Sequence, residues 1–343
     1  MREYGSDFHR CDSDFHGSSN YFNGLGCARL YACGRHAIDA IVAQEGWKRV
    51  WIPAYFCYEV VKHISASGIA VQFYYDYPLC NDDDALVRSL PYIEGDVLLR
   101  VNFFGLRGWR SNQDIPVPVI EDHTHALISG WALNSNADWC IASIRKSLPV
   151  AAGGILWSPI GKKLPKQIEA SSACEEMAKI RYTAMKMKAD YLRIGGDKNV
   201  FRNKYIDSEE MIEHLVLSGM DKESTRIIHA MDIKLWTELR SDNWHLAYSM
   251  LNKNFVILKS VEEDCWQPFS LIILCNSAEE RIALRQYLIE NCIYPAILWQ
   301  VPENTAFPAV LDFSQRMLVV HCDIRYDRNE IEKMCRIINS YYD

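Results

Sequence analysis

Short apolar runs alternate with helix-like stretches through the first half of this 343-residue chain, and this alternation limits the folds open to it. Helical spacing of apolar residues predicts helices over 34–44 and 58–67. Strands are predicted over 49–52, 69–75, 96–102, 117–121, 138–143 and 154–158. Strands separated by helices favour an α/β fold with a mostly parallel sheet and helices on both faces.

The second half has a different pattern. Residues 163–252 are rich in charge and contain few strand-like runs, so we expect them to be largely helical. A smaller α+β segment follows, with predicted strands over 255–258, 269–275 and 317–321 and predicted helices over 279–291 and 328–341. The length suits two domains. We place them at 1–240 and 241–343.

Composition excludes several classes of protein. The net charge of −7 argues against nucleic acid as the main partner, because phosphate binding requires a basic face. No apolar run reaches the roughly 18 residues of a membrane span. The 12 cysteines are scattered without a CxxC pair, which indicates reduced, mostly buried thiols. We therefore expect a cytoplasmic protein that acts on small molecules.

Polar side chains gather where the predicted strands end. Asn102, Asp122 and Ser143 each stand at the end of a strand, and Tyr55 follows another. Ligands of parallel sheets bind beyond the carboxyl ends of the strands. The sequence therefore predicts a ligand site at this edge.

Lys146 and Asp122 are the most informative pair at that edge. An enzyme that uses pyridoxal phosphate (PLP) needs a lysine to form a Schiff base and a carboxylate to keep the pyridine nitrogen protonated. Taken singly, Lys146 reads as a surface lysine and Asp122 as the cap of a following helix. Together and in this order they favour a PLP site.

A phosphate seat and a ring-stacking group are also present in the sequence. Gly34 and Arg35 open the first helix, whose N–H groups and dipole suit a phosphate, although simple helix initiation explains a glycine there equally well. Ser143 could add a hydroxyl. Tyr55 or Phe56 could stack on a cofactor ring or belong to the core.

A metal site is the competing interpretation of the same region. Asp122, His123 and His125 could bind zinc, but no further ligand group has recognisable spacing, so we expect no metal. The chain has no P-loop, no GxGxxG dinucleotide motif and no GxSxG nucleophile elbow.

Four blocks resemble the DegT/DnrJ/EryC1/StrS aminotransferases, in the order of that family. They are CGRHAI at 33–38, PAYF at 53–56, IEDHTHA at 120–126, and SIRK at 143–146 with the glycine pair at 153–154. The chain departs from the family in three places. The lysine block has a short S-x-x-K spacing, Arg35 stands where threonine is usual, and Cys57 occupies the usual stacking slot.

The resemblance implies the aspartate aminotransferase fold, PLP fold type I. That fold has a large domain with a mostly parallel seven-stranded sheet and a smaller C-terminal α+β domain. It implies PLP as cofactor, with Lys146 as the Schiff-base lysine, Asp122 at the pyridine nitrogen and His125 near the ring hydroxyl. It also implies a homodimer with the site at the subunit interface.

The activity implied is transfer of an amino group from an amino acid, glutamate above all, to a keto acceptor. A keto sugar or sugar nucleotide of cell-surface polysaccharide or secondary metabolism is one such acceptor. Asn102 or His125 would tune the ring hydroxyl, and Arg325 would bind a substrate carboxylate or form a surface salt bridge. The alternatives are a PLP-dependent lyase or dehydratase, a non-enzymatic ligand-binding relative, and a metal-dependent hydrolase using His123 and His125.

Overall fold

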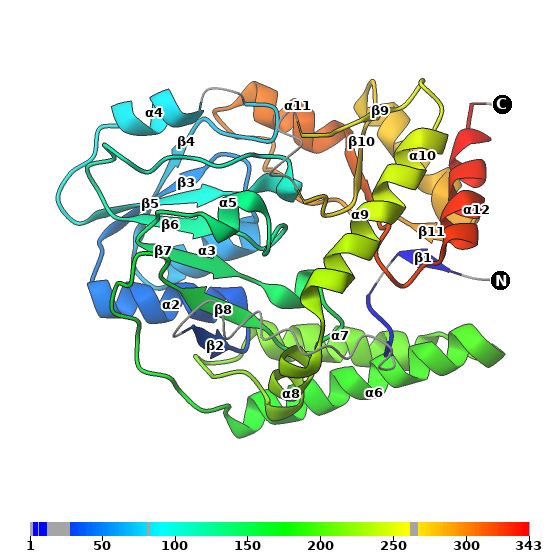
Figure 1. Cartoon of the computed structure of the whole chain (residues 1–343), viewed down its shortest axis with the longest axis horizontal. Coiled ribbons are helices and arrows are strands. Elements are labelled where there is room, and N and C mark those ends of the chain that lie inside the picture. The colour runs from blue at the N-terminus through cyan, green and yellow to red at the C-terminus, as the bar shows by residue number, and fades with distance from the viewer. Residues whose placement is uncertain (1–2, 6, 12–27, 81–82, 261–266, 343) are drawn as a thin grey trace.

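The computed structural model describes residues 3–5, 7–11, 28–80, 83–260 and 267–342. Its centre is a seven-stranded sheet in the order β2-β8-β7-β6-β5-β3-β4 (Figure 1). The strands are β2 (Arg29–Tyr31), β3 (Arg49–Pro53), β4 (Ala70–Tyr74), β5 (Asp96–Val101), β6 (Val119–Asp122), β7 (Trp139–Ala142) and β8 (Gly154–Trp157). Only β8 runs in the opposite direction to the other six strands, so its pairs with β2 and β7 are antiparallel and the other pairs are parallel. The predicted mostly parallel, seven-stranded α/β fold is confirmed.

Six of these strands match the predicted ranges, and β2 is the one that the apolar pattern did not reveal. It has three residues, of which only Tyr31 is buried. A strand this short, with one buried residue, gives too little alternation to be recognised. It pairs antiparallel with β8 and leads directly into the first long helix.

Both faces of the large sheet are covered, which explains the continuous apolar runs of its strands. In β5, Val97, Leu99 and Val101 belong to one hydrophobic cluster, while Leu98 belongs to another on the opposite face. The first cluster includes residues of α2 (Gly34–Glu45) and α3 (Tyr58–Ala66). The second includes residues of α6 (Ser172–Ile194), α8 (Lys222–Ala230) and α9 (Ile233–Met250).

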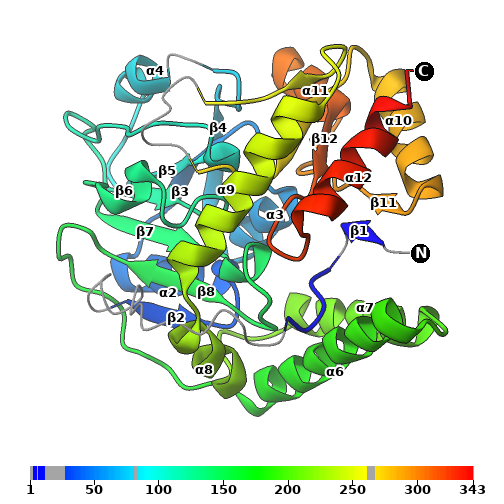
Figure 2. The ribbon, with the colours of Figure 1, turned by 45° about the vertical axis from the view of Figure 1, so that its right-hand side comes forward.

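The predicted helical region is confirmed between the sheet and the C-terminal segment. The long α6 forms a hairpin with α7 (Asn199–Glu213), and α8 and α9 follow. Figures 1 and 2 show α9 running between the large sheet and the C-terminal elements. The predicted domain boundary near residue 240 falls within this helix and stays a prediction. Among the described residues, no helix is both long and apolar enough to cross a membrane.

The C-terminal segment is α+β, as expected. A three-stranded antiparallel sheet has the order β12-β10-β9, formed by β9 (Val256–Ile257), β10 (Leu271–Leu274) and β12 (Met317–Val320). Its helices are α10 (Ala278–Glu290), α11 (Pro308–Arg316) and α12 (Arg328–Asn339). The short β1 (Tyr4–Gly5) pairs with β11 (Ile293–Tyr294), which attaches the N-terminal segment to this part of the molecule. The remaining described helices are short: α4 (Asp83–Ser89) and α5 (Gly130–Leu133).

Candidate cofactor site

The loop that carries Lys146 is fixed against the start of α2. After β7 the chain makes one 3₁₀ turn (Ile144–Lys146), and the Lys146 N–H donates to the Ser143 carbonyl (3.1 Å). Gly154 lies so close to the backbone of Cys33 that a Cβ atom would be 2.1 Å from the Cys33 oxygen. A side chain at that position would push the two segments apart. Close packing of backbone therefore places the lysine beside the first turn of α2.

A cavity of about 310 Å³ opens at this point. Seven of the residues predicted from the sequence line it: Gly34, Arg35, Phe56, Asp122, His125, Ser143 and Lys146. They come from four segments that are far apart in the chain, all at the carboxyl edge of the sheet. The structure therefore brings together most of the predicted cofactor site in one space.

Lys146 projects into this cavity. The side chain is accessible rather than buried, and it borders the cavity. Within the described part of the chain, its amine forms no hydrogen bond and no ion pair. Burial and the neighbouring charge of Arg145 lower the pKa of the amine. A lowered pKa increases the neutral, nucleophilic fraction that a Schiff-base lysine requires.

Asp122 presents a carboxyl group to the same cavity from the end of β6. It is 9% exposed, and one of its oxygens accepts a hydrogen bond from the Thr124 N–H (2.8 Å). Burial raises the pKa of this carboxyl. A buried carboxylate is stabilised by a cationic partner, and a protonated pyridine nitrogen is one.

His125 contributes a neutral ring. Its ring stacks with those of Phe104 and Trp299, whose centroids are 5.0 Å and 5.1 Å away. Its Nδ1 accepts a hydrogen bond from the Phe104 N–H (3.3 Å), which leaves Nε2 as the N–H donor. Burial, together with the charges of Lys146 and Arg240, lowers the pKa of His125 to about 3. The imidazole is therefore a neutral hydrogen-bond donor at physiological pH.

The start of α2 lines the cavity with Gly34 and Arg35. Gly34 begins the helix and lies against Ser143, whose Cβ atom would be 3.3 Å from a Cβ at position 34. Arg35 donates one hydrogen bond, to the carbonyl of Ile212 (3.2 Å), and keeps further N–H groups for a ligand. Helix N–H groups, a guanidinium and a hydroxyl make a donor set suited to a phosphate.

Two predicted residues, Tyr55 and Asn102, lie outside the cavity lining. Tyr55 is fully buried against Phe103 and Phe313, and its hydroxyl accepts a hydrogen bond from the Trp299 N–H (2.9 Å). Of the two predicted stacking candidates, Phe56 alone reaches the cavity. Tyr55 instead holds Trp299, an aromatic lining residue that the sequence did not reveal.

Asn102 is likewise buried beneath the site. Its backbone N–H donates to the Asp122 carbonyl (3.0 Å), and its side-chain amide donates to the Ser129 hydroxyl (3.0 Å). These bonds connect β5 to the end of β6. Asn102 therefore helps to hold the backbone of Asp122 in place without lining the cavity itself.

Arg325 lies at a second cavity of about 430 Å³, which shares four lining residues with the first: Arg145, Lys146, Glu209 and Leu298. Its guanidinium already forms a two-pronged ion pair with Asp323 (2.7 and 2.8 Å). It also lies over the ring of Phe8, 4.2 Å from the ring centre. The salt bridge foreseen as an alternative for Arg325 is therefore present, but it is buried rather than on the surface.

Glu209 is the charged residue that sequence reasoning missed. It lines both cavities and binds the guanidinium of Arg145 through two contacts of 2.7 and 2.9 Å, while Arg181 donates to it as well. Burial opposes its ionisation, but the two arginines hold the pKa of this carboxyl well below its usual value. Arg145 and Glu209 are 64 positions apart, so no local pattern could pair them.

The two histidines of the metal interpretation have different surroundings. His123 is fully buried, its Nε2 donates a hydrogen bond to the Glu121 carboxylate (3.0 Å), and its ring lies against Trp131 and Trp157. His125 faces the Lys146 cavity instead. Among the described residues, the one group with metal-ligand spacing is Glu121, His123 and Cys140, which does not include His125.

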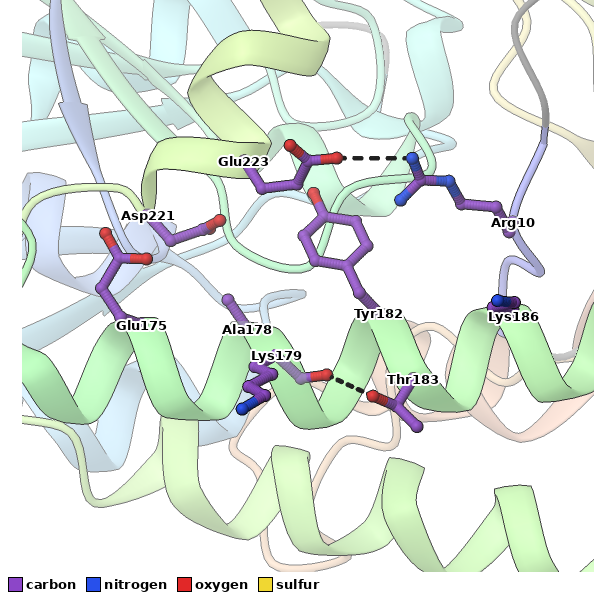
Figure 3. A pocket seen from close by; sticks show the side chains of 9 residues that line it. All are labelled: Arg10, Glu175, Ala178, Lys179, Tyr182, Thr183, Lys186, Asp221 and Glu223. Atoms are coloured by element: carbon purple, nitrogen blue, oxygen red, sulfur yellow. Dashed lines mark hydrogen bonds and ion pairs between the residues drawn. The ribbon is translucent and has the colours of Figure 1, made fainter.

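Another cavity, of about 660 Å³, lies away from the sheet edge, between the N-terminal segment, α6 and α8 (Figure 3). Arg10 pairs with Glu223 across it (3.3 Å), and Tyr182 shares a hydrogen bond with Ser224 (2.8 Å). None of the predicted cofactor residues lines it. Its larger volume therefore does not make it the better candidate for the PLP site.

Comparisons with known proteins give a likeness in structure alone. No family model matches the sequence, and no curated protein matches it. The solved structure of 3-amino-5-hydroxybenzoic acid synthase superposes with a TM-score of 0.64 at 15% identity, over 94% of this chain and 88% of that one. A DegT DnrJ EryC1 StrS aminotransferase from Brucella abortus gives 0.63 at 12% identity, over 94% and 87%.

A third likeness is to a protein of Streptococcus pneumoniae that is provisionally assigned as a sugar aminotransferase. Its apo-form has a TM-score of 0.64 at 13% identity, over 96% of this chain and 92% of that one. The same protein is also known in PLP- and PMP-forms, with TM-scores of 0.61 and 0.62. The likeness covers both the large sheet and the C-terminal segment, as the sequence resemblance implied. This chain therefore has the fold of the DegT/DnrJ/EryC1/StrS aminotransferases, PLP fold type I.

Proposed function

We propose that this protein is a PLP-dependent aminotransferase that moves an amino group from an amino acid to a keto acceptor. The observation that carries the proposal is the meeting of an unpaired Lys146 amine and the Asp122 carboxyl in one cavity. The fold and its neighbours among sugar aminotransferases support it. By the same likeness, we propose a keto sugar or sugar nucleotide as acceptor and glutamate as donor.

The residues present fit PLP as cofactor. The first turn of α2, with Gly34 and Arg35, and the hydroxyl of Ser143 would hold the phosphate. Asp122 would accept a hydrogen bond from the protonated pyridine nitrogen, and His125 Nε2 would donate to the ring hydroxyl. The phosphate and the ring hydroxyl of PLP would thus face hydrogen-bond donors of the protein, and the protonated pyridine nitrogen would face an acceptor.

PLP, when bound, supplies an electron sink that stabilises negative charge on the reacting carbon. The chain supplies the proton transfer and the orientation. Lys146 Nζ would attach the cofactor and, once displaced by the donor, carry a proton from the substrate carbon as a general base. Glu209, through Arg145, would fix the loop on which that amine moves.

The absorption spectrum tests the cofactor. The purified protein with added PLP should absorb in the visible range, and Lys146→Ala should abolish that absorbance. Lys146→Arg is the matched control, because it keeps the positive charge but cannot form a Schiff base. A wild-type protein that neither absorbs nor binds PLP would refute the proposal, and zinc analysis would then examine His123 and Glu121.

The reaction class needs a second measurement. Conversion of the bound cofactor to its amine form by glutamate would distinguish a transaminase from a lyase or dehydratase of the same fold. A protein that binds PLP but converts it with no amino acid would indicate the non-enzymatic alternative. The homodimer and the cytoplasmic location expected from the sequence remain predictions.

A further inference from the structure

The N-terminal segment forms part of the wall of the second cavity. Asp7 and Phe8 line this cavity together with Lys146, although they lie far from the lysine in the chain. The pairing of β1 with β11 fixes the start of the segment, and Figures 1 and 2 show the segment passing from β1 to the hairpin of α6 and α7. Residues near the N-terminus therefore close one side of the space that borders the proposed Schiff-base lysine.

Buried side chains from three parts of the molecule hold Asp7 and Phe8 at this wall. Four of them donate hydrogen bonds to the two residues: Arg181, Lys188, Tyr205 and Arg325. Three of these bonds go to backbone carbonyls, which any residue at positions 7 and 8 would offer. The bond from Arg181 goes to the Asp7 carboxylate (2.8 Å), so it alone of the four depends on the side chain at position 7.

Arg181 connects Asp7 to the loop of Lys146. It is 8% exposed, and it donates to a second carboxylate, that of Glu209 (2.5 Å). Glu209 in turn accepts from Arg145 through both of its oxygens (2.7 and 2.9 Å). Arg145 is the residue directly before Lys146. Four side chains of alternating charge, here called the charged row, thus lead along the second cavity to the lysine loop: Asp7, Arg181, Glu209 and Arg145.

The charged row balances its charge only when Asp7 is included. Its two guanidiniums carry two positive charges, and its two carboxylates carry two negative ones. Without Asp7, Glu209 alone would serve both arginines, and one positive charge of the row would have no counterion in it. The lysine responds to the same groups: after burial, the charge of Arg145 lowers the pKa of the Lys146 amine, Glu209 raises it, and Arg181 lowers it. A change at the far end of the row therefore reaches the amine.

We propose that Asp7 is a positioning residue of the Lys146 site. It holds Arg181 in place, and Arg181 in turn holds Glu209. Glu209 then fixes Arg145 and the loop that carries the lysine. This inference rests on the proposed aminotransferase function, in which the lysine moves a proton. It extends the site to the N-terminal segment, which contains none of the four sequence blocks.

Titration of the Lys146 amine tests the inference without cofactor. The pH dependence of its acetylation by acetic anhydride, followed by mass spectrometry, gives its pKa. Asp7→Asn should lower this pKa, because an unbalanced guanidinium disfavours the ammonium form, and Asp7→Glu should restore it. Glu3→Gln is the matched control: it removes a carboxylate of the same segment that binds Tyr191 and Tyr294 and lies outside the charged row. No shift in Asp7→Asn, or an equal shift in Glu3→Gln, would overturn the inference.

A double variant shows whether Asp7 acts through the charged row. In a Glu209→Gln background the link to Arg145 is already broken, so Asp7→Asn should shift the Lys146 pKa less than it does in the wild-type protein. Equal shifts in the two backgrounds would overturn the positioning role. The melting temperature should change little in Asp7→Asn, because the Asp7 side chain is 41% exposed. A large loss of stability with an unchanged titration would show a structural anchor instead.

The cofactor spectrum separates this inference from the proposed function. In Asp7→Asn, PLP should bind as in wild type, while the maximal rate of its conversion by glutamate falls about tenfold, because a displaced reacting group slows the chemistry. The glutamate concentration that gives half of this rate should stay the same. A raised concentration with an unchanged maximal rate would overturn the inference and leave the aminotransferase standing. An Asp7-dependent Lys146 pKa in a protein that takes up no PLP would refute the aminotransferase but not the coupling of Asp7 to Lys146.

Discussion

The cavity at the sheet edge and the cavity in Figure 3 differ in how their charged groups are satisfied. In the Figure 3 cavity Arg10 and Glu223 pair with each other, and Asp221 caps α8 through one oxygen, which accepts from the Ser224 N–H (2.8 Å). Among the described residues the other Asp221 oxygen has no hydrogen-bond partner, and burial raises the pKa of this carboxyl.

At the sheet edge, the Lys146 amine and the Asp122 carboxyl line one cavity without pairing with each other. Burial lowers the pKa of the Lys146 amine and raises the pKa of the Asp122 carboxyl. Fixed polar groups that the protein leaves unsatisfied at considerable cost point to a ligand more clearly than volume does. The following changes would break or sharpen this contrast.

Asp122→Asn should have the largest effect. The amide cannot stabilise a protonated pyridine nitrogen, so the rate of cofactor conversion by glutamate should fall about 100-fold or more. PLP should still bind, because Lys146 and the proposed phosphate-binding residues at the start of α2, Gly34 and Arg35, are unchanged. Single-turnover absorbance measures both quantities. A rate within a few-fold of wild type would show that Asp122 is merely a structural carboxyl.

His125→Gln should change the acid sensitivity of the fold. The unfolded protein protonates this histidine below its ordinary pKa of 6.5, whereas the folded protein resists until about pH 3. Stability is therefore lost as pH falls through that window, by up to roughly 1.4 kcal/mol for each pH unit. Glutamine cannot take up the proton, so urea unfolding at a series of pH values should show a flatter dependence in the variant.

Glu209→Gln should lower the free energy of unfolding moderately, and it should also change the pKa of Lys146. It removes the carboxylate shared by Arg145 and Arg181. Because the Glu209 side chain is 46% exposed, we expect a loss of about 1 kcal/mol. The folded-state pKa of Glu209 is lowered, so its contribution is present near neutral pH and disappears in acid.

The same variant should also shift the titration of Lys146. The charge of Glu209 raises the pKa of this amine, so its removal should lower the pKa of the Lys146–PLP linkage in a spectroscopic titration. An unchanged titration would place Glu209 outside the electrostatic reach of the lysine.

Arg10→Gln should have the smallest effect. It breaks a half-exposed ion pair with Glu223 in the Figure 3 cavity. Such pairs contribute about 0.5 kcal/mol or less, and Glu223 keeps Arg226 as a partner. The melting temperature and PLP affinity should both stay near wild type. A marked loss of PLP binding would show that the two cavities are coupled.

The sequence was informative wherever structure is decided locally. Strand alternation and helix spacing identified most of the sheet, and Asp122, Ser143 and Lys146 were placed correctly at its carboxyl edge. Aromatic residues were harder to assign. Phe56 reaches the cavity but Tyr55 does not, because adjacent positions point in different directions and only the packed core determines which one faces the site.

The sequence by itself determined the fold class and placed the candidate pair Lys146 and Asp122 at one sheet edge, since both depend on periodic patterns and on motifs a few residues long. Only the tertiary structure decided how the charges are paired. Glu209 forms an ion pair with Arg145 from a distant helix, and Asp323 forms one with Arg325. The physical reason is that an ion pair requires atoms within a few ångströms. Which side chains come that close is set by the packing of the whole chain.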